Sequence, residues 1–314
     1  MHLYKYMPYR DDFFKNPILR VTKLSELNDP FEGNLTLEQI KKKNKILNKY
    51  YDINEIDNEF EYNVQNDFEL SYDEINHEYG IIAFSEDPLN ILMWSHYAKQ
   101  HKGIVVQIEI DNNFLLNSFN KKENIFIGFS NIPEKVKYSM QREAFLFPEE
   151  ILPNNKYEFP HKNFYKAVFL NKSNDWLYEK EYRSILELIN ADIIQAEITN
   201  SDDMEELKII CEENNISYSI IDKKENIVKI AYPLNFEYNE ECGDECIRNE
   251  IFYIVMNYDA SYFYKVNPKS IKRVIFGSLF DKDINKIILN CNFDCDFYQT
   301  KISDTEFKLE IERL

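Results

Sequence analysis

Two of the chain's five histidines lie in one short segment, AFSEDPLNILMWSHYAKQHKG, together with a tryptophan and a tyrosine. This segment places Trp94, His96, Tyr97 and His101 on one expected helix. Ser85 precedes the start of that helix, where free backbone N–H groups favour an anion such as a pyrophosphate. Such a unit could hold a nucleotide, or its aromatic rings could simply pack a core.

The expected helix is apolar around much of its circumference. Leu89, Met93, His96 and Tyr97 fall on one face at helical spacing, and Trp94 lies on the adjacent face. The helix should therefore be largely buried. We expect Trp94 to be a core residue, with cofactor binding as the alternative. His96 and Tyr97 fit a core or a pocket wall equally well.

A second segment, DWLYEKEYR, carries paired carboxylates. Glu179, Glu181 and Arg183 are spaced two apart, so on a strand all three side chains would face the same side. Neighbouring carboxylates raise each other's pKa, which is typical of acid–base sites. In a glycosyl-type transfer, one glutamate can stabilise the developing positive charge or activate the acceptor. The alternative is an ion-paired strand face; we favour a functional role for Glu181.

A third segment, LNDPFEG, is expected to be a turn, because Asn and Asp bond their own backbone and Pro presets φ. In a purely structural interpretation, Phe31 anchors this turn. Alternatively, Asn28, Asp29 and Glu32 project into a site, since loops often carry functional residues.

The elements that would position these residues follow from the spacing of apolar residues and from turn signals. Asp87 is the expected cap of the central helix, with Pro88 at its first position. Helices are expected at about residues 35–79, 88–100 and in the first half of 163–188. Strands are expected at residues 2–9, just after Pro17, and at 80–84, 104–110, 134–139 and 180–188.

The composition limits the number of domains and the classes of function that the chain can have. Its 314 residues are 44% hydrophobic and 15% aromatic, enough for the core of one large or two modest domains. The net charge of −18 argues against broad electrostatic capture of nucleic acid, which needs a basic face. There is no apolar run of the roughly 18 residues that a membrane helix needs, and no signal-peptide pattern. We therefore expect a soluble cytoplasmic protein.

The five cysteines are expected to be thiols in a reducing cytosol. The pairs Cys242/Cys246 and Cys291/Cys295 have a spacing that a zinc site permits. Their surroundings lack the usual knuckle glycines, so no metal is expected.

The three segments above, with LYKY near the start and SIKRVIFGS near the end, resemble one known family. They are similar to the bacterial family known as domain of unknown function 2971. The resemblance extends from about Leu3 to about Ser278. The name of that family carries no settled activity.

The order of the expected elements also resembles the ADP-ribosyltransferase fold, in which three elements hold NAD around a split sheet. The resemblance implies that Lys5 or Tyr6 matches the first element, Ser85 with Tyr97 the second, and Glu181 the third, catalytic element. The first strand departs from the pattern, because it has neither His nor Arg at the expected position.

The sequence thus predicts an α+β protein with an ADP-ribosyltransferase-like split, mostly antiparallel sheet and flanking helices. Residues 1–195 would form the core domain, and residues 196–314 a C-terminal α/β extension packed on it; one continuous domain is the alternative.

Three functions are open. The first is an NAD-dependent ADP-ribosyltransferase-like enzyme, as in a bacterial toxin or an anti-phage defence effector. The second is a metal-dependent nuclease or phosphodiesterase, in which Asp29, Glu32, Glu179, Glu181 and His96 converge on Mg²⁺ or Mn²⁺. The third is a non-enzymatic sensor or partner-binding protein.

For the first function, the expected cofactor is NAD and the partners are a nucleotide-type small molecule, an unidentified acceptor macromolecule and a protein from the same operon. The expected catalytic residues are Glu181, His96 and Tyr97. The expected cofactor-binding residues are Lys5, Tyr6, Asn28, Asp29, Ser85, Trp94 and Arg183.

Overall fold

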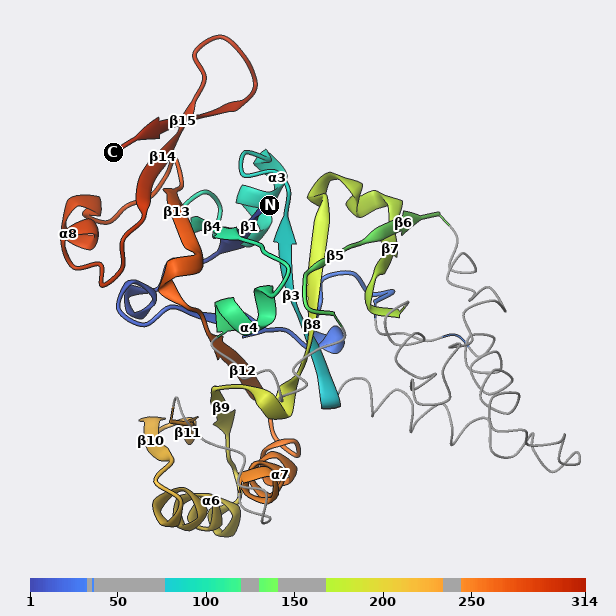
Figure 1. Ribbon diagram of the computed structural model, residues 1–314, viewed down its shortest axis with the longest axis vertical. Helices are drawn as coiled ribbons and strands as arrows, with labels where there is room; N and C mark the ends of the chain where they lie inside the picture. Colours follow the sequence, from blue (N-terminus) through green and yellow to red (C-terminus); the bar gives the residue numbers. More distant parts are fainter. Residues whose placement is uncertain (33–35, 37–76, 120–129, 141–167, 234–243) are drawn as a thin grey trace, which may run out of the picture.

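A computed structural model of the chain describes residues 1–32, 36, 77–119, 130–140, 168–233 and 244–314. The helical region expected at about residues 35–79 lies almost entirely outside them. The described residues form short helices around two main sheets (Figure 1).

The larger sheet has eight strands. They are β1 (His2–Met7), β3 (Tyr79–Ser85), β4 (Ile104–Glu109), β5 (Glu134–Lys135), β8 (Glu181–Glu187), β13 (Ile271–Phe276), β14 (Asp296–Ile302) and β15 (Leu309–Arg313). Their order across the sheet is β15-β14-β13-β4-β1-β3-β8-β5. Neighbouring strands are antiparallel except for the parallel pair β13–β14.

The second sheet has five antiparallel strands. They are β2 (Ile18–Val21), β9 (Ile193–Glu197), β10 (Ser217–Asp222), β11 (Ile227–Ala231) and β12 (Ala260–Lys265), in the order β10-β11-β9-β12-β2. Two short parallel strands, β6 (Lys137–Ser139) and β7 (Asn171–Ser173), form a third sheet. The predicted α+β class with mainly antiparallel pairing is confirmed for the described residues.

The helices of the described residues are short. The α-helices are α3 (Ile91–Tyr97), α4 (Phe114–Phe119), α6 (Ser201–Glu213), α7 (Asp244–Val255) and α8 (Ile284–Leu289). The 3-10 helices are η1 (Asp11–Phe14), η2 (Leu24–Glu26), η6 (Asn174–Glu179), η7 (Leu188–Asn190) and η8 (Pro268–Ser270). None of these helices has the length and apolar character needed to span a membrane.

Strands from both ends of the chain share both main sheets. β2 pairs with β12, where Arg20 lies opposite Phe263, and β4 pairs with β13, where Val106 lies opposite Val274. The expected domain boundary at residue 195 falls inside β9, which pairs with β11 and β12. The residues after 195 therefore contribute strands to the same two sheets as the residues before it.

The apolar core lies on both faces of the larger sheet, because side chains alternate along each strand. Val106 and Val274 belong to the main core, which also includes Ile194 and other residues of the second sheet. Val105 and Ile275 face the other way and pack in a smaller cluster around Trp94. β4 is buried along almost its whole length, and its buried residues include the polar Gln107.

Helix α3 begins later than the sequence predicts. Its cap is Asn90, whose side-chain oxygen accepts a hydrogen bond from the Met93 N–H at 3.1 Å. The predicted cap Asp87 instead accepts from the Leu89 N–H at 2.9 Å and closes a turn that contains Pro88. The prediction of a helix start at Pro88 is therefore wrong.

Helix α3 also ends earlier than predicted, at Tyr97 instead of near Gln100. Lys99, Gln100 and His101 have φ angles of 46°, 54° and 65°. These angles lie in the left-handed region, which a right-handed helix cannot continue. The resulting turn brings the chain back to the start of β4.

Two other expected elements are divided. The strand expected at residues 134–139 is two short strands in different sheets, because the Lys137 N–H donates to the Leu170 carbonyl at 2.7 Å and the chain then pairs with β7 instead of β8. The helix expected in the first half of 163–188 is, from residue 171 on, the strand β7 followed by η6. The strand expected at 180–188 is confirmed as β8.

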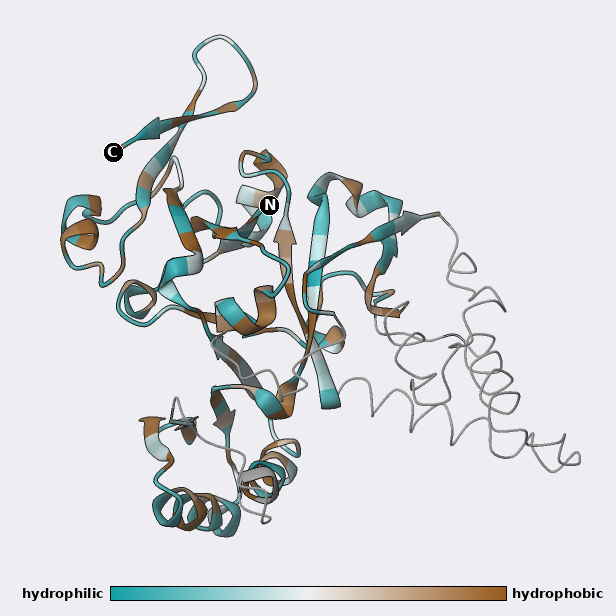
Figure 2. Cartoon of the chain, viewed as in Figure 1, coloured by the Kyte–Doolittle hydropathy of each residue, from teal (hydrophilic) through white to brown (hydrophobic). Residues whose placement is uncertain are grey.

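The larger sheet is weakly joined between β1 and β3. β1 forms six paired positions with β4, and β3 forms seven with β8. Between β1 and β3 the register contains only Tyr4 paired with Ser85. Most of β3 is hydrophobic, whereas the first part of β8 beside it is hydrophilic (Figure 2). The polar side chains of β8 therefore begin beside this split.

Candidate functional site

A cavity of about 310 Å³ opens where β1 and β3 separate. Its walls come from β1, β3, α3, β7, η6, β8 and the loop that ends at Glu32. This volume is at the lower end of the roughly 300–1,000 Å³ that small-molecule sites occupy.

Most of the predicted site residues meet at this cavity, although they come from segments far apart in the sequence. Those that line it are Lys5, Tyr6, Asn28, Ser85, His96, Tyr97 and Glu181. Three other predicted residues, Asp29, Trp94 and Arg183, are buried but are not among the lining residues.

Lys172 is the centre of a buried ion-pair cluster in the cavity wall. Its Nζ lies 2.6 Å from Glu179 Oε2, 3.1 Å from Glu181 Oε2 and 3.8 Å from Glu32 Oε2. The centroid of the Trp176 ring lies 4.9 Å from the same ammonium group. None of the four charged side chains is more than 6% exposed, so each charge depends on its partners for stability.

Arg183 lies behind Glu181 and is fully buried. Its Nε and Nη2 donate to the two oxygens of Glu181 at 2.8 and 2.9 Å, a bidentate pairing. Nη2 also donates to Glu32 Oε1, and Nη1 donates to the Phe169 carbonyl at 2.6 Å. Since these donors are used within the protein, Arg183 orients Glu181 and does not reach the cavity.

The spacing predicted that Glu179 lies on the same strand as Glu181. Glu179 instead lies at the end of η6 and reaches the cluster from there. Lys180, between the two glutamates, has a left-handed φ of 47°, so the chain turns sharply there. Both carboxylates nevertheless meet at Lys172. Tyr97 fixes the other oxygen of Glu179, because its hydroxyl donates to Oε1 at 2.5 Å. Asn28 lies beside the same hydroxyl.

The surroundings shift the pKa values of the two glutamates in opposite directions. Burial alone would raise the pKa of Glu181, but the charges of Arg183 and Lys172 outweigh it and lower the pKa to about 2. For Glu179, burial outweighs the attraction of Lys172, and the pKa is raised. Burial raises the pKa of Glu32 in the same way. Carboxylates of one cluster with opposed pKa shifts are typical of acid–base pairs.

Lys5 is a second cation on the cavity wall. Burial lowers the pKa of its ammonium group to about 8, although the charge of Glu181 acts in the opposite direction. Within the described residues Lys5 has no ion-pair partner, which leaves its charge available to a ligand.

Ser85 does not form the predicted unit with a helix N-terminus, because α3 begins only at Ile91. Its hydroxyl donates to the Glu179 carbonyl at 2.6 Å and accepts from the Asp87 N–H at 3.1 Å. Ser85 therefore holds the end of η6 against the turn before α3. His96 is exposed at the cavity rim.

Trp94 and Asp29 have structural partners. Trp94 is fully buried, packs edge-on against Tyr6 and donates from Nε1 to the Pro88 carbonyl at 2.8 Å. Asp29 Oδ1 accepts from the Phe31 N–H at 2.9 Å, which fixes the turn. Phe31 itself is 59% exposed.

Lys172 and Tyr138 were missed by the sequence analysis. The Tyr138 hydroxyl accepts a hydrogen bond from the Glu181 N–H at 2.9 Å and so fixes the start of β8. Neither residue belongs to a motif with a recognisable spacing. Glu32 was expected to project into a site from the LNDPFEG turn or to bind a metal, and it does line the cavity.

The structure describes both side chains of the second cysteine pair. Cys291 and Cys295 are half-buried free thiols, and Cys242 lies outside the described residues, as does the side chain of Cys246. In the described part of the chain, no group of three or more His, Cys, Asp and Glu side chains is arranged to hold a metal ion.

Residues 93–184 match the model of a family described as protein of unknown function, DUF2971. The predicted resemblance to this family is therefore confirmed over that segment. The segment includes Tyr97, Lys172, Glu179, Glu181 and Arg183. Comparisons with curated proteins and with solved structures find no match.

Proposed function

We propose that the 310 Å³ cavity lined by Glu32, Glu179 and Glu181, which we call the acidic cavity, binds NAD. The chain would then be an ADP-ribosyltransferase-like enzyme, which transfers ADP-ribose to an acceptor. The observation that carries this proposal is the pair Glu179 and Glu181. Both contact Lys172 in the cavity wall, and their surroundings shift their pKa values in opposite directions. Such a pair suits a reaction that needs one permanent anion and one group that takes up a proton.

Each glutamate has a separate role in this proposal. Bound NAD would supply a ribose that gains positive charge as its bond to nicotinamide breaks. Glu181, kept ionised by Arg183 and Lys172, stabilises that charge. Glu179 takes the proton that the acceptor loses as it bonds to the ribose carbon, and nicotinamide leaves with the electron pair of the broken bond. Tyr97 is a positioning residue, because it orients the Glu179 carboxylate.

The lining of the cavity is compatible with one end of a dinucleotide. Tyr4, Tyr6, Phe84 and Tyr97 offer aromatic surface to a flat ring, and Lys5 offers a cation to a phosphate. The volume of about 310 Å³ suits one nucleoside, so the rest of NAD would extend outside the cavity. The split between β1 and β3 also resembles the expected ADP-ribosyltransferase arrangement, although a fold by itself does not determine function.

A metal-dependent nuclease is the second candidate, because Glu32, Glu179 and Glu181 do converge. Their common neighbour, however, is an ammonium group 2.6 to 3.8 Å from their oxygens. A Mg²⁺ or Mn²⁺ ion would have to displace Lys172 from this position. The cluster therefore favours the nucleotide proposal.

A thermal-shift titration of the full chain with NAD, beside Mg²⁺ and Mn²⁺, tests the proposal. NAD should raise the unfolding midpoint as its concentration passes the dissociation constant. Glu181→Gln and Glu179→Gln should keep this shift, whereas nicotinamide release from NAD should slow by about 100-fold or more. The exposed Glu212→Gln is the matched control and should change neither value.

Two variants are needed because Glu181 is buried between two cations, so its replacement can also reduce stability. Glu179→Gln leaves the Arg183–Glu181 pair intact. The nuclease would be selected if only Mn²⁺ raises the unfolding midpoint of the wild type and if neither variant shows this shift. The sensor is favoured instead if no ligand changes the midpoint and NAD is not consumed.

A further inference from the structure

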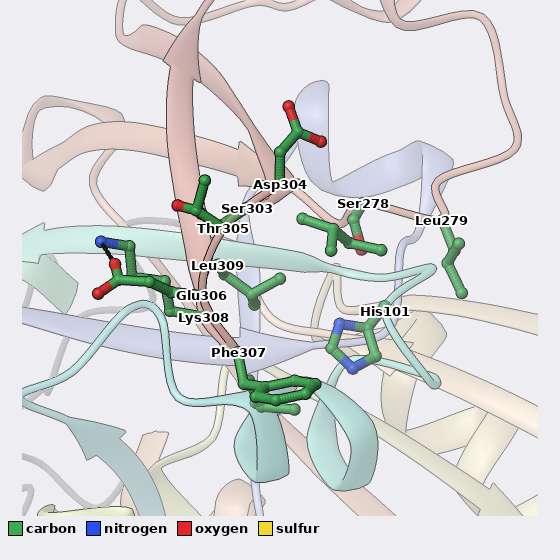
Figure 3. A pocket seen from close by; sticks show the side chains of 12 residues that line it. His101, Ser278, Leu279, Ser303, Asp304, Thr305, Glu306, Phe307, Lys308 and Leu309 are labelled. Atoms are coloured by element: carbon green, nitrogen blue, oxygen red, sulfur yellow. Dashed lines mark ion pairs between the residues drawn. The ribbon is translucent and has the colours of Figure 1, made fainter.

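The described residues form a second cavity, of about 520 Å³, between the turn after α3 and the β14–β15 hairpin (Figure 3). Its wall combines apolar side chains such as Phe307 with the charged side chains of Asp304, Glu306 and Lys308. This wall does not favour one class of ligand. The acidic cavity, in contrast, contains a side chain with a distinct reactivity, Lys5.

Lys5 lies in the wall of the acidic cavity, on the part of β1 that separates from β3. It is half-buried, and no ion pair or hydrogen bond holds its ammonium group among the described residues. The other lysine of this wall, Lys172, contacts three carboxylates. Lys172 is therefore fixed as a cation, whereas the amine of Lys5 is available to a ligand.

The surroundings of Lys5 favour its neutral form. Burial, together with the charges of Arg10 and Arg20, lowers the pKa of Lys5 to about 8, although the charge of Glu181 acts in the opposite direction. About one in ten Lys5 side chains is therefore a neutral amine at pH 7, against about one in 2,500 for a lysine of ordinary pKa. A neutral lysine is a nucleophile, and burial is a common way to produce one.

We propose that Lys5 forms an imine with a small aldehyde that binds in the acidic cavity and carries no negative charge. The volume of about 310 Å³ limits the ligand to about the size of one nucleoside or less. Glu32, Glu179 and Glu181 in the same wall disfavour a further anion. Formation of the imine does not depend on the proposed binding of NAD.

The reaction needs no other reagent. The lone pair of the neutral Lys5 Nζ attacks the carbonyl carbon, and the carbonyl oxygen takes one Nζ proton and becomes a hydroxyl group. This hydroxyl group leaves as water with the second Nζ proton as the C=N bond forms. A proton from solvent then makes the imine a cation. The charge of Glu181 stabilises this cation, as it does the ammonium group.

Benzaldehyde with sodium cyanoborohydride tests the proposal on the full chain, because the reagent reduces a protonated imine to a stable benzylamine. Mass spectrometry measures the labelling rate at each amine, and fragment ions separate Lys5 from the α-amino group of Met1. At pH 7, Lys5 should be labelled at least about tenfold faster than Lys223. Lys223 is exposed and has no ion-pair partner in the described part of the chain.

A thermal-shift titration without the reducing agent measures binding of the aldehyde. Benzaldehyde should raise the unfolding midpoint of the wild type, because the imine exists only in the folded protein. Lys5→Arg keeps the positive charge but cannot form an imine, so it should lose this shift. Lys223→Arg is the matched control and should keep it. Benzyl alcohol has a similar shape but no carbonyl group, and it should give a smaller shift.

A second aldehyde, para-formylbenzoate, differs from benzaldehyde by one carboxylate. Relative to the rate at Lys223, it should label Lys5 about tenfold more slowly than benzaldehyde does, because three glutamates line the cavity. Faster labelling by para-formylbenzoate would mean that Lys5 is an anion-binding ammonium group, and the proposal would be wrong. It would also be wrong if Lys5 reacted no faster than Lys223, or if Lys5→Arg kept the benzaldehyde shift. All of these measurements omit NAD, so their failure leaves the proposed NAD binding unaffected.

Discussion

At the residue scale, Lys172 is a buried cation shared by three carboxylates, one from the LNDPFEG turn and two from the DWLYEKEYR segment. Lys172→Met should lower the free energy of unfolding by about 3–5 kcal/mol, because it leaves Glu179 and Glu181 buried with one cation fewer. Lys172→Arg keeps the charge and should cost less. Urea unfolding followed by circular dichroism measures both values.

The control for this prediction is Lys208→Met, which removes an exposed ion pair with Glu205. Exposed pairs contribute about 1 kcal/mol or less, so this variant should be nearly neutral. A loss for Lys172→Met as small as that for Lys208→Met would show that the buried cluster does not depend on Lys172.

The low pKa of Glu181 leads to a prediction about acid stability. Its pKa of about 2 in the folded protein lies below the ordinary value of 4.5, so the unfolded chain takes up the proton first as the pH falls. Ionised Glu181 therefore contributes stability above about pH 4.5 that is lost toward about pH 2, about 3 kcal/mol in all. Glu181→Gln should show a shallower loss in urea unfolding over this range.

Glu179 and Glu32 act in the opposite direction, because their pKa values are raised. The folded protein binds their protons first, so stability increases as the pH falls from neutral through their raised pKa values toward about 4.5. Glu179→Gln should remove part of that increase. An identical pH profile for wild type and both variants would contradict the opposed shifts.

Sequence patterns predicted several residues that line the acidic cavity, but they did not predict the buried cation Lys172. Tyr97 and Glu181 belong to segments with recognisable composition, and both line the cavity. Lys172 lies in NKSNDW, where a lysine is most simply an exposed residue. It is buried only because the chain from β7 through η6 to β8 folds back on itself, and local spacing does not contain that information.

At the scale of elements, the turn after α3 is a source of strain. Each non-glycine residue in the left-handed region costs about 1–2 kcal/mol. Gln100 is exposed and has a φ of 54°. Gln100→Gly should therefore raise the free energy of unfolding by about 0.5–1 kcal/mol, after allowing for the greater freedom of glycine in the unfolded chain.

Denaturant unfolding tests this prediction against a neighbouring position. Lys102 is exposed but does not have a positive φ, so Lys102→Gly should be slightly destabilising. Similar effects of the two glycines would mean that backbone conformation does not limit stability in this turn.

The beginning of α3 shows why caps are hard to predict from sequence. Asp87 followed by Pro88 is a favourable start signal, yet the Asp87 carboxylate bonds the Leu89 N–H and lies 3.2 Å from Lys180. Asn90 caps the helix and also donates to the Tyr178 carbonyl at 2.9 Å. Contacts with the segment around residues 178–180 thus accompany the choice of Asn90 over Asp87 as the helix cap.

At the scale of the whole molecule, a fragment that ends at residue 195 should not fold alone. It would lose β13, which pairs with the central strand β4, and β12, which pairs with β2 and β9. Leaving the backbone groups of buried strands unpaired costs free energy, and this cost would exceed the small net free energy of unfolding of a fragment. Circular dichroism should show a cooperative unfolding transition for the full chain and none for the fragment.

A cooperative transition in the fragment would instead support an independent N-terminal domain. The class of the fold could be predicted because short apolar strands and amphipathic helices have local patterns. The pairing of β4 with β13 could not be predicted, since about half of the chain separates these strands and any buried apolar strand has a similar pattern. The domain expectation at residue 195 was therefore made without knowledge of the pairings across it.

Three packed aromatic rings connect the acidic cavity to the turn after α3. Tyr6 lines the acidic cavity, Trp94 packs edge-on against it with ring centroids 5.6 Å apart, and His101 stacks on Trp94 with ring centroids 6.3 Å apart. A ligand that tilts Tyr6 therefore has a direct steric route to His101. Trp94, which does not itself line the acidic cavity, would be the fluorophore that reports its occupancy.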